Sequence, residues 1–436
     1  MDKLPEAPAS KPLRLRWVMI GFAFLATMLN YIHRLSFTYL SADGELRKLI
    51  PDDAFGYLGT AFFIAYMISN AFSGLAIDRL GTKLGYALTM AFWTTAGLFH
   101  AFAVTPLQFG ICRFALGLGE AGNWPAALKL TSEWFPPHER STASGIFNSG
   151  SALGAIIVPP LVAVMAINYG WQYTFIILAI FGYLWLAAFW FSYYTPGKSA
   201  QEVKAKVVPA FKLLKSKYVG GLLTAKIFIE PVWYFVTFWI GRYLADVHGW
   251  NIKTIGWFAV IPFIMADVGN IVGGYFTQYI IKRGIPIPKA RRIALTISGV
   301  FMALPLLAAP FVVTTPMAGL IVFGISGFGY TSYTANALAL TADVVPKSSA
   351  ASAWGLACIG NGIGGAIFQS FSGITLKSVV AKSGYAFGYN ILFLVFGVSV
   401  VIGMIILLVF AGKFERDKAL QEYAEGNVPV LESAPS

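Results

Sequence analysis

Apolar stretches recur along the whole chain and are separated by short polar segments. Each stretch is at least about 20 residues long, the length that an α-helix needs to cross the hydrocarbon core of a bilayer. The short alternating segments typical of a membrane β-barrel do not occur. The pattern therefore predicts an all-α integral membrane protein with twelve spans, at residues 17–40, 54–77, 84–104, 107–130, 142–167, 171–194, 219–245, 254–281, 291–312, 317–342, 349–376 and 384–411.

A sequence repeat divides these spans into two halves. The acidic-x-x-Pro segment at 133–136 and the glycines after it recur 210 residues later, and the segment 74–83 resembles 274–283. Two repeats of six spans each have the same orientation in the membrane. We therefore expect a tail at 1–16, a six-helix bundle at 17–194, a linker at 195–218, a second six-helix bundle at 219–411 and a second tail at 412–436.

Basic residues are distributed unevenly between the two sides of the membrane. Of the 32 lysines and arginines, 22 lie in the tails, the linker and the loops of the same side, 5 lie in the opposite loops, and 5 lie within or at the ends of spans. Because Lys and Arg accumulate on the cytoplasmic side, both tails and the linker are predicted to be cytoplasmic, in an inner (cytoplasmic) membrane. The formal net charge of +12 is thus a topology signal, with lipid as the contact, and does not indicate nucleic-acid binding.

Composition and motif content exclude several other classes of protein. The chain is 57% hydrophobic and 12% charged, whereas soluble domains have about 25% charged residues. Its two cysteines, Cys112 and Cys358, lie in apolar segments, so we expect no disulfide framework. Metal-ligand spacings, phosphate-binding loops and nucleophile elbows are absent from the sequence, so we expect no cofactor, no metal and no enzymatic activity.

The fourth predicted span carries two charges in an apolar setting. Arg113, Gly117, Glu120 and Trp124 recur at steps of three and four residues, so on a helix they share one face. A charge at mid-membrane costs about 2.5–3.5 kcal/mol on insertion scales, so such residues usually face a cavity or a partner. These charges indicate a transport pathway; the alternative is a pair that only holds helices together.

Several segments resemble those of the major facilitator superfamily, over nearly the whole chain. Asp-Arg-Leu-Gly-Thr-Lys at 78–83 is similar to that superfamily's loop between spans 2 and 3, and 113–119 is similar to its span-4 signature. Within the superfamily, the chain resembles the anion:cation symporters and, most closely, the hexuronate transporters. The segments that carry this narrower resemblance are Asn30-Tyr31, Gly-Glu-Ala-Gly-Asn-Trp-Pro at 119–125, Glu133-Trp-Phe-Pro136 and Pro231-Val-Trp233.

The resemblance implies roles for individual residues. Arg34 matches the arginine that contacts the substrate carboxylate, and Tyr31 and Tyr66 match tyrosines that contact the substrate. Glu120 matches a carboxylate implicated in proton coupling. The family usually has Asp where this chain has His33, so a second protonatable carboxylate is missing. Either His33 takes its place or the coupling stoichiometry differs.

The chemistry of these side chains is compatible with such roles. A guanidinium stays charged and offers a planar fork to a carboxylate, although Arg34 could instead form a salt bridge with Glu120. Burial favours the protonated form of a carboxyl group and a nearby arginine favours the charged form, so Glu120, with Arg113 on the same face, can respond to the state of the site. His33 can titrate near neutral pH or act as a neutral hydrogen-bonding group.

Further polar and aromatic residues within the spans are candidates for the site. Lys226 and Glu230 lie one helical turn apart, and we favour a structural pair there. Asp78 and Arg79 are expected to form a cytoplasmic gate. Aromatic rings can stack on sugar faces, and amide and hydroxyl groups can bind substrate hydroxyls or join helices. The predicted substrate-binding residues of these kinds are Asn123, Trp124, Asn148, Ser151, Trp233, Tyr330, Asn336 and Asn361.

These patterns predict a secondary transporter that imports a small organic anion together with protons by alternating access. By the family resemblance, the anion is a hexuronate or a related sugar acid. A uniporter or exchanger of different selectivity is the alternative within transport. A multi-span membrane enzyme is a remote alternative, because the loops are short and the unusual charges lie inside the spans. We expect the protein to act as a monomer.

Overall fold

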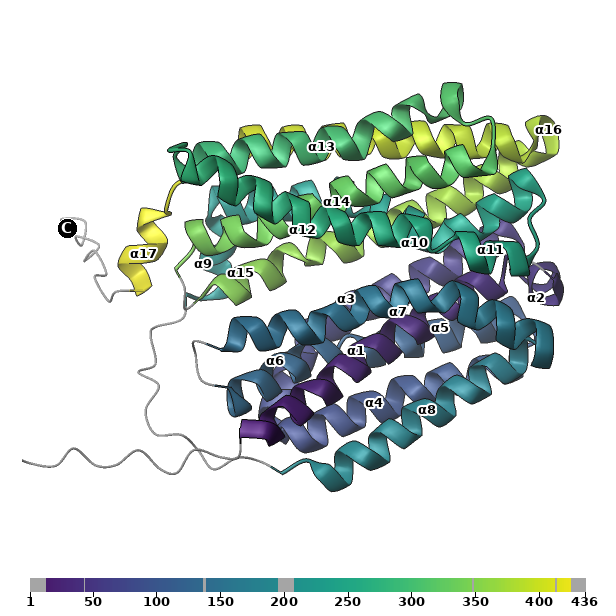
Figure 1. The fold of residues 1–436 in the computed structure, drawn as a ribbon, viewed down its shortest axis with the longest axis horizontal. Coiled ribbons are helices and arrows are strands. Elements are labelled where there is room, and N and C mark those ends of the chain that lie inside the picture. The colour runs from purple at the N-terminus through teal and green to yellow at the C-terminus, as the bar shows by residue number, and fades with distance from the viewer. Residues whose placement is uncertain are drawn as a thin grey trace, which may run out of the picture.

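The computed structural model of the protein describes residues 13–42, 44–135, 139–194, 208–346, 349–411 and 414–424. These residues form helices that lie in two groups alongside each other (Figure 1). The first group comprises α1 (Leu13–Leu40), α2 (Gly44–Leu49), α3 (Asp52–Leu80), α4 (Thr82–Phe99), α5 (Pro106–Glu120), α6 (Asn123–Trp134), α7 (Arg140–Tyr169) and α8 (Trp171–Ser192). The second comprises α9 (Ala210–Lys215), α10 (Lys217–His248), α11 (Ile252–Phe258), α12 (Ile261–Lys282), α13 (Ile287–Val312), α14 (Pro316–Val344), α15 (Ala350–Ala357), α16 (Ile359–Ile405) and α17 (Lys418–Ala424).

The all-α membrane fold predicted from the apolar pattern is confirmed. Seven segments within the described residues are long and apolar enough to cross a membrane. One of them, Ser352–Phe410, turns at Gly384, whose φ of +78° lies outside the helical region, so this segment accommodates two of the predicted spans. The other four predicted spans correspond to shorter or less apolar segments, namely α3, α4, the α5–α6 pair and α14.

The fourth predicted span consists of two helices instead of one. α5 ends at Glu120, and α6 begins at Asn123. Pro125 gives a physical reason for the break, because it has no N–H to donate to the carbonyl group of Ala121 and its ring crowds that position. The helical face that was expected to continue to Trp124 therefore ends at Glu120.

Several predicted segments lie wholly or partly outside the described residues. They are the tails at 1–16 and 412–436 and the linker at 195–218. The part of the linker that is described contains α9, and the N–H of Val208 just before it donates to Oγ of Ser349 at 2.9 Å. The domain boundaries remain predictions.

The two groups of helices contact each other at the end that carries α2 and α11, which we call the far end (Figure 1). There α3 approaches α16 so closely that a Cβ atom at Gly56 would lie 3.0 Å from the Cα of Gly373. α7 meets α11 in the same way, since a Cβ at Gly256 would lie 2.9 Å from the carbonyl oxygen of Pro159. Small residues permit this close approach of backbones, so the far end is closed.

The opposite end, which carries α9 and α17, is called the tail end, and the two groups diverge toward it (Figure 1). A Cβ atom at Gly74, Gly145, Gly274 or Gly355 would meet no described atom within 4 Å. These glycines form two matched pairs of the sequence repeat, on α3 and α12 and on α7 and α15. The two groups are therefore in contact at the far end and lie farther apart at the tail end, where these helices have open space beside their glycines.

Candidate functional site

A buried ion pair joins α1 to α5 inside the first group of helices. Nε of Arg34 lies 2.7 Å from Oε2 of Glu120, and Nη2 of Arg34 donates to Oδ1 of Asn30 at 3.1 Å. Arg34 is 8% exposed, and Glu120 is fully buried. Because α5 ends at Glu120, the carbonyl group of this residue can accept from the side-chain amide of Asn30, at 3.3 Å. The helix break thus holds the carboxylate in position opposite Arg34.

Arg113 brings a second guanidinium group to this ion pair. Its Nη1 donates to the backbone carbonyl of Arg34 at 3.1 Å, whereas its Nε and Nη2 are buried without a partner among the described residues. Within the same part of the chain, Oε1 of Glu120 is also buried and unpartnered. When all three groups are ionised, two positive charges face one negative charge. We call these three residues the first cluster; it has one positive charge that no carboxylate of the cluster balances.

Three aromatic rings surround the guanidinium group of Arg34. Its central carbon lies 5.0 Å from the ring centre of Tyr31, 5.2 Å from that of Phe62 and 4.9 Å from that of Tyr66. Rings at such distances stabilise a cation through their π faces and leave its N–H edge available to a planar ligand. The structure therefore brings together Arg34, Glu120, Tyr31 and Tyr66, the four residues to which the family resemblance assigned roles.

His33 points away from the first cluster. Its Nε2 lies 3.2 Å from the carbonyl oxygen of Leu178 on α8, and its Nδ1 faces Gly97 on α4, where a Cβ atom would lie 2.6 Å away. Consecutive residues of a helix point about 100° apart, so the side chains of His33 and Arg34 leave α1 in different directions. Proton coupling by His33 remains a prediction. If it holds, His33→Asn should flatten the pH dependence of uptake between about pH 5 and 8.

A second buried ion pair lies in the other group of helices. Nζ of Lys226 lies 2.5 Å from Oε1 of Glu230, and the hydroxyl of Tyr330 donates to Oε2 of Glu230 at 2.6 Å. Both charged residues are 1% exposed. Trp233 stacks on Tyr330, with ring centres 5.1 Å and planes 4° apart. The expected Lys226–Glu230 pair is thus present, and it contacts Tyr330, one of the predicted substrate-binding residues.

Asn123 and Asn336 join helices within their own groups. Asn123 accepts from the hydroxyl of Tyr86 at 2.8 Å and donates to Oγ1 of Thr27 at 3.0 Å. Asn336 accepts from the hydroxyl of Thr277 at 2.6 Å and donates to two backbone carbonyl groups. Polar side chains commonly join membrane helices in this way. Substrate binding by these two residues remains a prediction, to which their present contacts lend no support.

Three other predicted substrate-binding residues lie on α6 and α7. Asn148 is exposed on α7, and Ser151 donates to the backbone carbonyl of Asn148 at 2.7 Å. Trp124 on α6 meets Phe147 edge to face, with ring centres 5.6 Å apart. Asn148 lies one turn from Gly145, where the space beside α7 is open. Their contribution to substrate binding remains a prediction.

The predicted gate at Asp78 and Arg79 lies at the tail end of α3. The side chain of Asp78 is outside what the structure describes, and Arg79 is exposed. Nζ of Lys129 on α6 donates to the carbonyl group of Ile77 at 2.9 Å, which attaches α6 to this end of α3. Gating by Asp78 and Arg79 remains a prediction.

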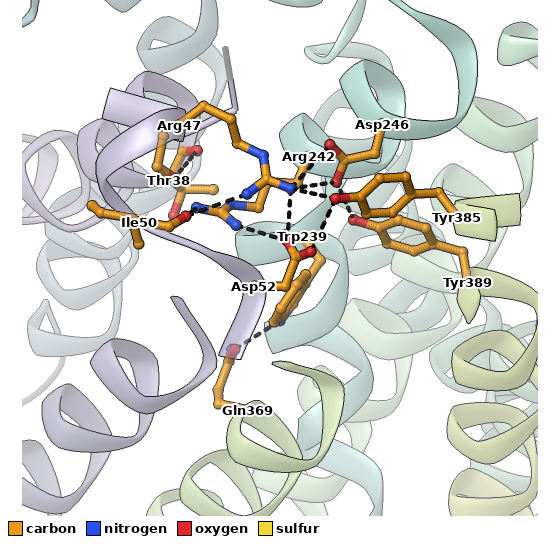
Figure 2. A network of polar contacts seen from close by, with 11 residues as sticks. Thr38, Arg47, Ile50, Asp52, Trp239, Arg242, Asp246, Gln369, Tyr385 and Tyr389 are labelled. Carbon is orange, nitrogen blue, oxygen red and sulfur yellow. Dashed lines mark hydrogen bonds and ion pairs between the residues drawn. The ribbon is translucent and has the colours of Figure 1, made fainter. Parts of the chain in front are cut away.

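A polar network that the sequence analysis missed closes the far end (Figure 2). Oδ1 of Asp52 accepts from Arg47 at 2.8 Å and from Arg242 at 2.9 Å. Arg47 also lies 3.3 Å from Asp246, and the hydroxyl of Tyr385 donates to Oδ2 of Asp52 at 3.1 Å. The network thus ties α2 and α3 of the first group to α10 and α16 of the second.

Charges in this far-end network are balanced and largely buried. Two arginines face two aspartates, and Arg242 is fully buried. Burial by itself lowers the pKa of Arg47, which lies in α2 between two spans, but Asp246 and Asp52 together raise it above its usual value. Arg47 therefore remains charged, and its ion pairs hold the far end closed.

We expect Asp52→Asn to open the far end. Removing one partner of a buried ion pair leaves the other charge uncompensated, at a cost of about 3–5 kcal/mol. The readout is a cysteine in place of Thr38, a fully buried residue beside the network, in a chain that has Cys112 and Cys358 replaced by alanine. In intact cells, an impermeant maleimide should label this cysteine at least about tenfold faster in the Asp52→Asn variant.

Asp53→Asn is the matched control for this experiment. Asp53 pairs with Lys377, whose side chain is 66% exposed, and exposed pairs contribute little to stability. Its substitution should leave the labelling rate unchanged. Equal labelling rates in the two variants would show that the far-end network does not hold the groups together.

Neither ion pair resembles a metal site. In the residues that the structure describes, no group of three His, Cys, Asp or Glu side chains lies close enough together to hold a metal ion. Both ion pairs join a cation to a carboxylate, a chemistry that suits the binding of an organic anion and of protons.

Comparisons with known proteins identify relatives of this chain. The family model described as Major Facilitator Superfamily matches residues 14–369. The chain is 29% identical over 412 residues to a hexuronate transporter of Escherichia coli (strain K12). This alignment covers 90% of this chain and 93% of that protein. It is 31% identical over 322 residues to a galacturonate transporter of Dickeya chrysanthemi, in an alignment that covers 68% of this chain and 93% of that protein.

A solved structure shares the arrangement of the helices. It is a bacterial homolog to the human lysosomal transporter Spinster, in an inward-facing and unoccupied conformation. The TM-score is 0.77 and the identity is 19%, with 93% of this chain and 98% of that chain covered. At this level of identity the likeness shows a common fold.

Proposed function

The chain belongs to the major facilitator superfamily, and on this premise we propose that it imports a hexuronate or a related sugar acid together with protons. It does so as a monomer, by alternating access, in an inner membrane with both termini in the cytoplasm. The observation that carries the proposal is the first cluster, in which Arg34 pairs with the buried carboxylate of Glu120 and Arg113 brings a second positive charge that no carboxylate of the cluster balances. Similarity to proteins named as hexuronate and galacturonate transporters supports the choice of substrate.

Competition for Arg34 links the substrate to the proton. When Glu120 is ionised, it occupies Nε of Arg34 at 2.7 Å. When Glu120 is protonated, this attraction weakens, and the guanidinium group can form charge-assisted hydrogen bonds with a substrate carboxylate. The proton and the substrate anion therefore favour each other's binding, as a symporter requires.

Closure at alternate ends then moves the substrate across the membrane. With the tails in the cytoplasm, the described arrangement is open toward the cytoplasm and closed toward the outside. Substrate from outside gains access only after the contacts of Asp52 and Arg242 break. Glycines near the tail end of α3, α7, α12 and α15 leave room for the two groups to approach there in the opposite state.

A ligand screen on the purified protein tests the proposed function. A ligand that binds the native state raises its apparent stability, by about 2.7 kcal/mol at a hundred times the Kd. We expect sugar acids to raise the melting temperature and neutral hexoses of the same stereochemistry to leave it unchanged. A chain that is folded but stabilised by no sugar acid would contradict the proposal.

We expect cysteines introduced into the linker 195–218 to be accessible only from the cytoplasm. The reason is the distribution of basic residues, 22 on that side against 5 on the other. An impermeant reagent should label these cysteines in inside-out vesicles and not in intact cells, whereas a cysteine beside Lys253, on the opposite side, should show the reverse. Labelling of the linker in intact cells would show that the linker lies outside the cell and would contradict the predicted topology.

A further inference from the structure

The Lys226–Glu230 ion pair makes more polar contacts than packing between helices requires. Both carboxylate oxygens of Glu230 are used, one by Lys226 and the other by the hydroxyl of Tyr330. Nζ of Lys226 also lies 4.2 Å from the centre of the Trp354 ring on α15. Replacing a buried ion pair by well-packed apolar side chains is often neutral or stabilising, so stability alone does not explain these charges.

Two unpartnered polar groups lie on helices that contact this ion pair. The hydroxyl of Tyr333 is buried without a partner among the described residues, and Tyr333 lies one helical turn after Tyr330, whose hydroxyl donates to Glu230. Oδ1 of Asn361 is also buried and lacks a partner in the described chain. Asn361 follows Gly360, where a Cβ atom would lie 3.1 Å from Cβ of Lys226. A hydroxyl-bearing ligand would satisfy both groups, because a hydroxyl both donates and accepts.

The helix that carries the second ion pair contacts the first cluster at the interface between the groups. The guanidinium carbon of Arg113 in the first cluster lies 5.7 Å from the ring centre of Phe238 on α10, the helix that also carries Lys226 and Glu230. Tyr234 on α10 contacts Phe63 of α3, with ring centres 4.2 Å apart. The first cluster and α10, which carries the second ion pair, therefore meet at the same interface between the groups.

We propose that Lys226, Glu230 and Tyr330 form the second half of the binding site and bind the hydroxyl groups of a substrate that carries a single carboxylate. The inference rests on the proposed function and adds the class of sugar acid to it. The first cluster has one unbalanced positive charge, which one carboxylate neutralises. The Lys226–Glu230 pair is neutral overall, and it offers both an acceptor and a donor to hydroxyl groups.

A second carboxylate on the substrate would lie in the second half of the site, where the Lys226–Glu230 pair has no net positive charge to balance it. Burying a charge without a counter-charge opposes binding strongly. Galacturonate, a monocarboxylate, should therefore bind at least about tenfold more tightly than galactarate, the six-carbon dicarboxylate of the same stereochemistry. Calorimetry on the purified full-length protein gives both affinities.

Glu230→Gln should shift this preference toward the dicarboxylate. The substitution leaves Lys226 without its carboxylate, so the second half of the site gains one positive charge. The affinity for galactarate relative to galacturonate should rise at least about tenfold. Asp343→Asn is the matched control, because Asp343 pairs with Arg291 at 3.0 Å in the same group of helices. It should leave the ratio unchanged, and an unchanged ratio in Glu230→Gln would overturn the proposal.

If Glu230→Gln does not fold, a double variant tests whether the ion pair binds the substrate. Lys226→Met combined with Glu230→Leu removes the ion pair without leaving an unpaired charge. If the pair binds hydroxyl groups, the affinity for galacturonate falls about tenfold or more while the melting temperature is retained. If the double variant binds galacturonate as tightly as the parent protein, the ion pair only packs the helices together and does not bind the substrate.

Binding of the two sugar acids by the unmodified protein distinguishes a failure of the proposed function from a failure of this inference. If it is folded but binds neither sugar acid, the proposed function fails, and this inference fails with it. If it binds galacturonate and galactarate equally, the inference alone fails and the proposed function stands.

Discussion

Glu120→Gln is expected to abolish uphill accumulation of the substrate while preserving its binding and exchange. Uphill transport requires a group that takes up a proton on one side and releases it on the other, and an amide cannot titrate. The side-chain oxygen of Gln can still accept from Nε of Arg34, where Oε2 of Glu120 lies at 2.7 Å. The guanidinium group therefore stays in position, and the variant resembles the protonated protein.

Transport assays in proteoliposomes check this expectation in two formats. Under an imposed pH gradient, the Glu120→Gln protein should bring the substrate only to equal concentrations, whereas exchange between equal pools continues. Glu133→Gln is a control in the same group of helices, because Glu133 accepts from the hydroxyl of Tyr193, away from the first cluster. Accumulation by Glu120→Gln at the parental level would move proton coupling to another residue.

Arg34→Lys should cost most of the affinity for a carboxylate substrate. Nε and Nη2 of Arg34 already hold Glu120 and Asn30, so the planar group positions itself and can present its remaining edge to a ligand. An ammonium group keeps the charge but lacks the fork, and it cannot occupy all of these positions together. Hydrogen bonds to charged groups contribute about 1.5–3 kcal/mol, so the Kd should rise by about 10- to 100-fold.

The matched control is Arg16→Lys, because Arg16 forms a partly exposed ion pair with Glu139 near the tail end. Titration of the purified variants with a sugar acid gives the two dissociation constants. Only the Arg34 variant should bind weakly, and Arg34→Ala should bind more weakly still. Near-parental affinity in Arg34→Ala would remove this residue from the binding site.

The parts of the site that depend on helix periodicity and on charge could be predicted from the sequence. Arg34 and Glu120 are charged residues in apolar spans, where an unpaired charge is costly, so the sequence predicts either a mutual ion pair or a role in substrate binding. The Lys226–Glu230 pair follows from their four-residue spacing. In both cases the partner lies on the same helix or within the same group of helices.

The far-end network could not be predicted in this way, because its partners are distant in the sequence. Arg242 and Asp52 are 190 residues apart, and Tyr385 and Asp52 are 333 apart. These contacts depend on how the two groups dock, which no local pattern encodes. The four-residue spacing of Arg242 and Asp246 was a signal, but it would have suggested a pair within α10 instead of a connection to Asp52.

His33 shows a different limit of sequence reasoning. Its adjacency to Arg34 suggested a shared site, yet consecutive helical residues point about 100° apart, and its ring lies against α4 and α8. The break after Glu120 was missed for a related reason. A run of apolar residues and glycines looks continuous on a hydropathy pattern, whereas the missing N–H of Pro125 acts on the backbone.

Accumulation of a labelled hexuronate by proteoliposomes that contain the purified protein tests the central claim most directly. With an alkaline interior, the internal concentration should rise above the external one, and a protonophore should abolish this excess without blocking exchange. The Arg34→Ala protein should show neither accumulation nor exchange. Entry of the hexuronate that stops at equal concentrations in the parent protein, with or without the pH gradient, would contradict proton-coupled import.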